Sequence, residues 1–271
     1  MSKELDKSHV RAVDWVAMFG LLLLTRIPWA PSYFGVDRVN LAYALEEFNP
    51  ALHQPQPPGY PLFVALARLV NALVDDPHTT FLIISIGVSA LSLPVLFALA
   101  VRMFSPGAAR IAVFLFVLNP AFWMTSLRSP LRPHLALFGL LVAYCCWRCL
   151  NGERAYGLWG ALALGIGAGF RPDLFAYMFP LWILCAWIGT RSRAAVLWAT
   201  LILGLVVLIW LVPLVLTAGN PGSYLELILT YTAQQSGGES IVLGSNWGPW
   251  LHQLSRLVTW NGLAVVGWFW A

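Results

Sequence analysis

The sequence predicts an all-α, polytopic membrane protein with about eight transmembrane helices and two short interfacial helices in its first outer loop. Hydrophobic residues make up 59% of the 271 residues, charged residues only 10%, and the mean hydropathy is +0.72. Soluble domains carry roughly a quarter charged residues, and one domain of this size cannot bury so much apolar surface. Lipid is therefore the expected solvent for much of the chain.

Apolar runs of spanning length recur along the sequence. A helix that crosses about 30 Å of hydrocarbon needs about 20 apolar residues, because each residue adds about 1.5 Å. The predicted spans are residues 12–30, 79–103, 108–126, 133–150, 155–171, 173–190, 194–218 and 257–271. Only Arg171-Pro172-Asp173 separates the fifth span from the sixth, which predicts a tight hairpin at the membrane edge.

The charged residues predict the orientation. With a cytoplasmic N-terminus, every inner turn carries at least two basic residues, and eight of the 12 acidic residues fall in outer segments. This distribution satisfies the positive-inside rule and predicts a multi-pass protein of the cell (inner) membrane. Two outer segments are long, at about 31–78 and 219–256, and long loops are common places for function.

Two classes of function are disfavoured by composition. The basic residues are spread singly between apolar runs, so the sequence does not indicate a nucleic-acid partner. The four cysteines lie inside apolar runs, which predicts packing rather than a disulfide framework or a metal site. No cofactor is predicted, and the sequence does not define whether a divalent metal is needed.

The first outer loop holds an acidic residue and a proline-rich segment. Asp37 precedes a short helical pattern, which it is expected to cap, and the apolar positions of that helix are expected to rest on the membrane. The stretch His53-Gln54-Pro55-Gln56-Pro57-Pro58-Gly59-Tyr60-Pro61 is expected to be stiff and extended, and residues 60–74 form a second short helix.

This loop resembles that of the GT-C superfamily, the membrane glycosyltransferases that use polyprenyl-phosphate sugars, and in particular its protein-mannosyltransferase and aminoarabinose-transferase groups. The resemblance extends to Asn119-Pro120-x-Phe122-Trp123 and to Gly169-Phe170-Arg171-Pro172-Asp173. It implies that the core is residues 1–218, including the outer loop 31–78, and that Asp37 is the catalytic base. Residues 219–271 are expected to be an outer loop and a partial further helix of a truncated chain.

The chemistry of such a transfer assigns roles to further residues. The acceptor hydroxyl must lose a proton, and the departing phosphate needs fixed cations. Arg128, Arg132 and Arg171 lie at outer helix ends, at headgroup depth, and are the predicted phosphate partners. A single-step attack inverts the anomeric centre. The acceptor stays undefined.

Five other residues are predicted as possible substrate contacts, namely His53, Tyr60, His134, Glu46 and Glu47. Each also has a purely structural interpretation. The glutamates are typical of solvated loop charges, and His53 of a brace for the prolines. In the same structural interpretation, Asp37 pairs with Arg38 and Arg171 pairs with Asp173. Arg128 and Arg132 then contact lipid headgroups.

Three functions stay open at this stage. A transporter or lipid flippase is typified by ionisable groups or broken helices near the bilayer midplane, whereas the ionisable residues here lie mostly at helix ends. A non-catalytic GT-C-like membrane subunit stays open because Arg38 stands where many relatives have an acid or a small polar residue. The glycosyltransferase is the predicted function.

A glycine-bearing stretch at 234–240 is a candidate lid.

Overall fold

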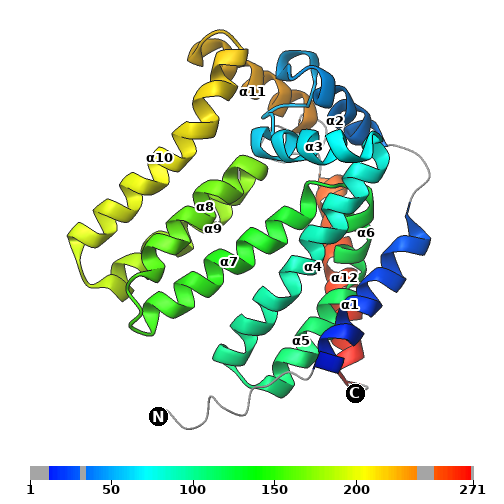
Figure 1. Cartoon of the computed structure of the whole chain (residues 1–271), viewed down its shortest axis with the longest axis vertical. Helices are drawn as coiled ribbons and strands as arrows, with labels where there is room; N and C mark the ends of the chain where they lie inside the picture. Colours follow the sequence, from blue (N-terminus) through cyan, green and yellow to red (C-terminus); the bar gives the residue numbers. More distant parts are fainter. Residues whose placement is uncertain (1–11, 31–34, 237–246, 270–271) are drawn as a thin grey trace.

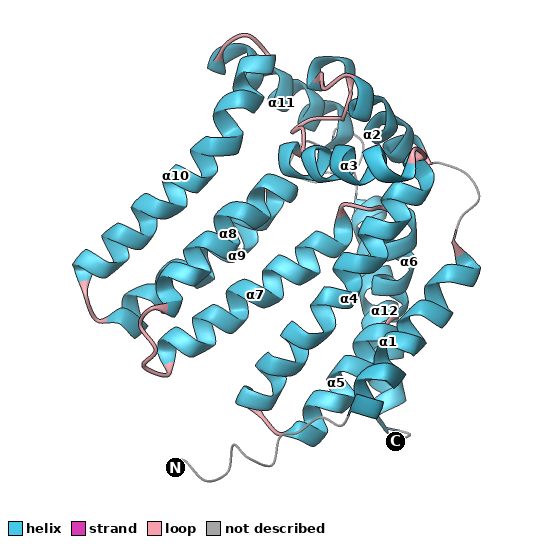
Figure 2. Cartoon of the chain, in the orientation of Figure 1, coloured by secondary structure: helices cyan, strands magenta, loops and turns pink. Residues whose placement is uncertain are grey.

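The computed structural model describes residues 12–30, 35–236 and 247–269, and within these ranges the regular elements are all helices (Figures 1 and 2). Part of the candidate lid, residues 237–240, lies outside the described residues. The helices are α1 (Ala12–Arg26), α2 (Val36–Glu46), α3 (Pro61–Val74), α4 (Pro77–Met103), α5 (Pro106–Leu118), α6 (Pro120–Arg128), α7 (Arg132–Leu150), α8 (Tyr156–Phe170), α9 (Asp173–Thr190), α10 (Arg193–Thr217), α11 (Pro221–Ser236) and α12 (Trp247–Phe269).

The predicted all-α polytopic membrane fold is confirmed. Among the described residues, α4, α7, α9 and α10 are each long and apolar enough to cross a membrane, and the bent pair α5–α6 makes a fifth candidate span. The other predicted spans fall on α1, α12 and the shorter apolar helix α8. The long helices run side by side, while α2, α3 and α11 lie together at one end, called here the upper end (Figure 1). The lower end carries the turns at 104–105, 151–155 and 191–192.

The predicted continuous span 108–126 is broken. The chain bends by 50° between α5 and α6. Pro120 lacks an amide hydrogen and disfavours continuation of the preceding helix, and the side-chain oxygen of Asn119 accepts a hydrogen bond from the Phe122 amide at 3.0 Å to begin a new one. Arg26 is fully buried at this break and donates to the Val117 carbonyl at 2.7 Å, so it satisfies a backbone group that the bend releases.

The first outer loop packs onto the bundle. Leu41 of α2 is buried against α3 and α4 with Phe63, so the apolar face of α2 meets protein, and the expectation that it rests on the membrane is wrong. Tyr60 adopts a left-handed conformation at φ 52° immediately before α3. The Tyr224 hydroxyl of α11 donates to the Pro58 carbonyl at 2.8 Å, which fixes α11 over the proline segment.

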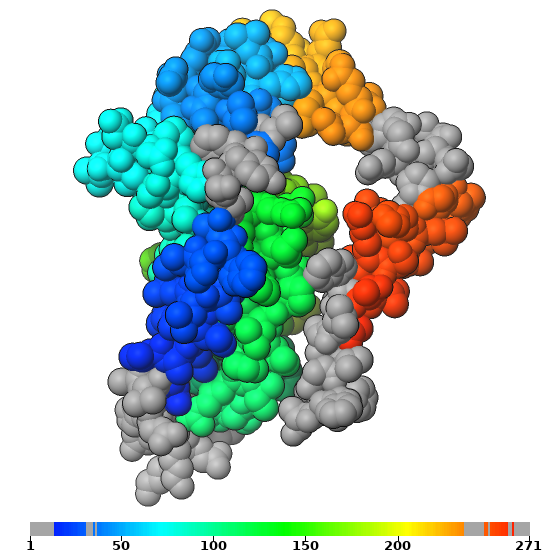
Figure 3. All heavy atoms as spheres, turned by 90° about the vertical axis from the view of Figure 1, so that its right-hand side faces the viewer, coloured from blue at the N-terminus to red at the C-terminus, as the bar shows by residue number. Residues whose placement is uncertain are grey.

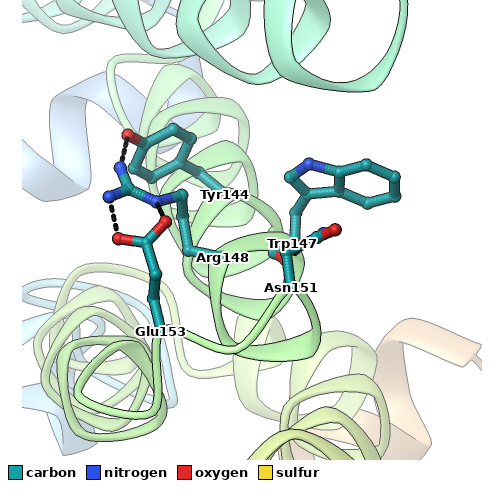
Figure 4. A network of polar contacts seen from close by, with 5 residues as sticks. All are labelled: Tyr144, Trp147, Arg148, Asn151 and Glu153. Carbon is teal, nitrogen blue, oxygen red and sulfur yellow. Dashed lines mark hydrogen bonds and ion pairs between the residues drawn. The ribbon is translucent and has the colours of Figure 1, made fainter. Parts of the chain in front are cut away.

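A polar network fixes the α7–α8 turn at the lower end (Figure 4). The Arg148 guanidinium donates two hydrogen bonds to the Glu153 carboxylate and another to the Tyr144 hydroxyl. It also lies 4.2 Å from the centre of the Tyr156 ring. Because the hydrogen bonds from Arg148 favour the ionised carboxylate, the pKa of Glu153 lies below its usual value. This arginine is therefore fully engaged within the protein.

Close helix contacts in the bundle depend on glycine. A Cβ atom added at Gly189 in α9 would lie 2.5 Å from the Cys149 carbonyl oxygen of α7, whereas one added at Gly204 in α10 would meet nothing within 4 Å. Small residues permit this close approach of membrane helices.

We predict that Gly189→Ala destabilises the protein by about 1–3 kcal/mol, because backbone atoms must shift to admit the methyl group. Gly204→Ala is the matched control and is expected to be neutral or slightly stabilising. Thermal unfolding in detergent measures both. Equal midpoints for the two variants would contradict the close α7–α9 contact.

Candidate active site

A cavity of about 690 Å³ lies at the upper end and is called here the upper cavity. Residues of α2, α6, α7 and α12 line it, and Figure 3 shows the hollow between the green atoms of α5 and α6 and the orange-red atoms of α12. Its ionisable lining residues are Asp37, Arg128, Arg132 and Arg256. Three positive charges against one negative charge leave a formal surplus of +2, so the lining favours an anion.

Asp37 reaches the upper cavity from the first turn of α2. Gly35, rather than Asp37, occupies the position that begins this helix, so the expected cap is not formed by Asp37. Its carboxylate is exposed, whereas the neighbouring Arg38 side chain is buried, with only 2% of its surface exposed. The two side chains therefore lie in different surroundings, and Arg38 does not line the cavity. Burial lowers the pKa of Arg38.

The predicted phosphate partners divide into two groups. Arg128 ends α6 and Arg132 begins α7, and both exposed side chains line the upper cavity. Arg171 lines a second, smaller cavity of about 280 Å³ with Tyr60, Asp173 and Tyr231. The first two arginines thus share a cavity with Asp37, and the third does not.

Arg171 is engaged by its neighbour. Its Nε and Nη2 atoms donate to the two Asp173 carboxylate oxygens at 2.9 and 2.6 Å, and its guanidinium lies 5.8 Å from the centre of the Tyr60 ring. Burial opposes the charge of Arg171, but the paired Asp173 outweighs burial and raises the pKa. This geometry fits the structural reading of Arg171 as a charge that braces the α8–α9 turn.

The negative charge of Asp37 affects the pKa of two tyrosines, Tyr60 and Tyr231. Burial raises the pKa of Tyr60 to about 12, and Asp37 adds to the rise, while Arg171 opposes it. Burial and Asp37 also raise the pKa of Tyr231. Both tyrosines line the smaller cavity, whereas Asp37 lines the upper cavity. Both phenols stay protonated near neutral pH and retain a hydroxyl hydrogen to donate.

The other predicted contacts line neither cavity. His53 is exposed and packs its ring edge-on against that of Tyr231, with ring centres 5.5 Å apart. His134 is 1% exposed, stacks on Phe170 at 4.6 Å, and lies 3.1 Å by its Nδ1 atom from the Pro130 carbonyl. Glu46 and Glu47 are exposed on the loop surface. Among the described residues, no group of three or more His, Cys, Asp or Glu side chains is arranged to hold a metal ion.

Sequence reasoning missed Arg256 as a site residue. It lies on α12 three residues after Gln253, and both line the upper cavity. Helical spacing on the amphipathic stretch after 247 was the available signal, but nothing in the sequence shows that this helix returns to α6.

Together these features define a multi-pass membrane protein with a cation-rich cavity and one carboxylate at one end of its helix bundle. A family model described as dolichyl-phosphate-mannose-protein mannosyltransferase matches residues 54–216, which is more than half of the chain. The chain belongs to this family, whose members are membrane glycosyltransferases of the GT-C type. Comparisons with curated proteins and with solved structures gave no match. Asp37 precedes the matched segment, so its role is argued from the cavity.

The pairing of Arg171 with Asp173 gives a testable consequence. Asp173→Asn removes the carboxylate charge and is expected to cost about 1 kcal/mol, because the pair is only partly exposed to water. Asp75→Asn is the matched control: Asp75 ends α3 in a left-handed conformation that asparagine tolerates well. Unfolding midpoints in detergent compare the two. A midpoint for Asp173→Asn equal to that of Asp75→Asn would show that the pair contributes no stability.

Proposed function

We propose that this protein transfers a sugar from a polyprenyl-phosphate-linked donor to an acceptor hydroxyl, with the reaction in the upper cavity. The observation that carries the proposal is the meeting of Asp37 with Arg128, Arg132 and Arg256 in one cavity. In such a transfer, one carboxylate takes up the proton of the acceptor hydroxyl, and the surrounding cations stabilise the leaving polyprenyl phosphate.

In the proposed step, Asp37 is the general base. The acceptor oxygen attacks the anomeric carbon of the sugar while its proton passes to the Asp37 carboxylate. The bond from the anomeric carbon to the phosphate oxygen breaks, and the electron pair leaves with the polyprenyl phosphate. Attack on the face opposite the leaving group inverts the anomeric centre. Positioned bases of this kind contribute about 10²–10⁴-fold to rate.

The leaving phosphate is the proposed ligand of the arginines. Guanidinium groups bind phosphate oxygens through paired hydrogen bonds, and their charge opposes the negative charge that grows on the leaving oxygen. Arg128 and Arg132 lie at adjoining helix ends, the depth at which a lipid phosphate resides. Arg256 adds a third cation from α12 on the facing side of the cavity.

The membrane side of this reaction is proposed from charge. The upper end carries the acidic first loop, and the basic turns at 102–110 and 191–193 lie at the lower end. By the positive-inside rule the lower end faces the cytoplasm, and the upper cavity opens on the extracytoplasmic side of the cell membrane.

One observation favours the alternative of a transporter or flippase. The α5–α6 span is broken and has a fully buried arginine, Arg26, beside the break, and broken helices are typical of transporters. However, Arg26 donates to a backbone carbonyl and faces the Phe122 ring at 5.6 Å, so it acts as a brace for the break. Transfer chemistry is therefore the better-supported proposal.

The role of Asp37 is tested by Asp37→Asn. We expect turnover to fall about 10²–10⁴-fold with little change in donor KM, because the amide takes up no proton. Membranes containing the protein are assayed with a panel of short-chain polyprenyl-phosphate hexoses and pentoses and a hydroxyl acceptor. Asp75→Asn makes the same change outside both cavities and should retain full activity. Unchanged turnover in Asp37→Asn would exclude Asp37 as the base, whereas a non-catalytic subunit would show no turnover even in the unaltered protein.

The arginines are tested through the product. Arg128→Gln, Arg132→Gln and Arg256→Gln should each weaken polyprenyl phosphate binding about tenfold, which corresponds to about 1.4 kcal/mol. Arg154→Gln, an exposed arginine at the lower end, is the matched control and should bind as the unaltered protein does. Equilibrium binding of the labelled product in detergent measures the series. Equal affinity across all four variants would contradict a phosphate site in the upper cavity.

A further inference from the structure

The lower end has a basic hollow that the proposed function does not use. Trp187, Arg191, Ser192 and Arg193 line a space of about 200 Å³ at the turn from α9 to α10. Both arginine side chains are exposed, and Trp187 is 55% exposed at the end of α9. The hollow therefore presents two positive charges beside an indole ring, at the edge of the predicted membrane.

These two arginines differ from others at the same end. Arg148 is engaged by Glu153, and Arg110 lies 3.3 Å from the Asp14 carboxylate. Within the described ranges, neither Arg191 nor Arg193 has a hydrogen bond or an ion pair from its side chain. The Ser192 hydroxyl already accepts a hydrogen bond from the Ala195 amide at 3.3 Å. Two exposed guanidinium groups thus line one hollow without a partner among the described residues.

An apolar groove lies on α10, next to the basic hollow in sequence. Ala194, Leu197, Trp198 and Leu201 line a space of about 290 Å³ along the first turns of α10. Their side chains are exposed, so this face of α10 meets the lipid of the predicted membrane. Arg193 and Ala194 are adjacent in sequence, so the charged hollow and the apolar groove are lined by neighbouring residues in the first turn of α10.

We propose that this composite surface is a binding site for an anionic phospholipid of the bilayer. The phosphate lies against Arg191 and Arg193, Trp187 lies at the level of the headgroup, and one acyl chain follows the groove along α10. Guanidinium groups bind phosphate with paired hydrogen bonds, tryptophan favours the membrane interface, and basic clusters at a membrane surface select anionic lipids. The charged hollow thus matches the phosphate headgroup of a lipid, and the apolar groove matches its acyl chain.

The site is separate from the upper cavity. α10 has 25 residues and spans about 37 Å at about 1.5 Å per residue, with the hollow at its lower end. A lipid held there reaches neither Asp37 nor the arginines of the upper cavity. The proposal therefore stands independently of the transferase proposal, and its ligand is a bilayer lipid and not the sugar donor.

The test measures lipid retention. The full chain, purified in detergent, is incubated with vesicles of phosphatidylglycerol and phosphatidylcholine in equal amounts, and bound lipids are counted by native mass spectrometry. The unaltered protein should retain phosphatidylglycerol preferentially. Arg191→Gln/Arg193→Gln should lower that retention at least about fivefold, as expected for loss of basic charge at a lipid surface.

Two further variants separate the site from general charge and from misfolding. Ala194→Trp keeps both arginines but fills the groove, and should also lower phosphatidylglycerol retention. Arg154→Gln removes a charge at the same end outside the hollow, and should leave retention unchanged. Unfolding midpoints check that every variant is folded. The proposal would be overturned if the double variant retained as much phosphatidylglycerol as the unaltered protein. It would also be overturned if the unaltered protein retained phosphatidylcholine equally well, or if Arg154→Gln lost as much retention as the double variant.

Discussion

The hydrocarbon of a bilayer supplies no hydrogen bonds, and this constraint governs where polar groups lie in the chain. Charges therefore collect at helix ends, and helices from distant parts of the sequence end at the same depth. Asp37, in the first turn of α2, and Arg128, at the end of α6, come together for this reason, and Arg256 joins them from within α12. The same rule gathers Arg191 and Arg193 at the opposite end.

The broken α5–α6 span is where the constraint is met inside the bundle. A bend of 50° releases backbone groups, and Asn119 and Arg26 satisfy them. The buried Ser85 hydroxyl also donates to the Ser126 carbonyl and ties α4 to α6. The break tilts α6 so that Arg128 ends beside the start of α7. Side chains of the break thus set the position of one wall of the upper cavity, although none of Arg26, Ser85 or Ser126 lines it.

Much of the fold was predictable from hydropathy, because spanning helices need long apolar runs whatever their neighbours are. The break at Asn119-Pro120 was not predicted, although the proline was visible, because an apolar run through a proline reads as one span. Asp37, Arg128 and Arg132 were named from the sequence and share a cavity. Arg256 was missed and Arg171 pairs with Asp173, because both facts depend on which helices meet. The division at residue 218 and the membrane side stay predictions.

The central claim is that one cavity holds both the base and the phosphate partners. A cryo-electron microscopy structure of the full chain with a non-transferable polyprenyl-phosphonate sugar tests it most directly. We predict phosphonate oxygens within about 3 Å of guanidinium groups of the upper cavity, with the anomeric carbon turned toward the Asp37 carboxylate. A phosphonate bound elsewhere, or an anomeric carbon on the side away from Asp37, would contradict the account.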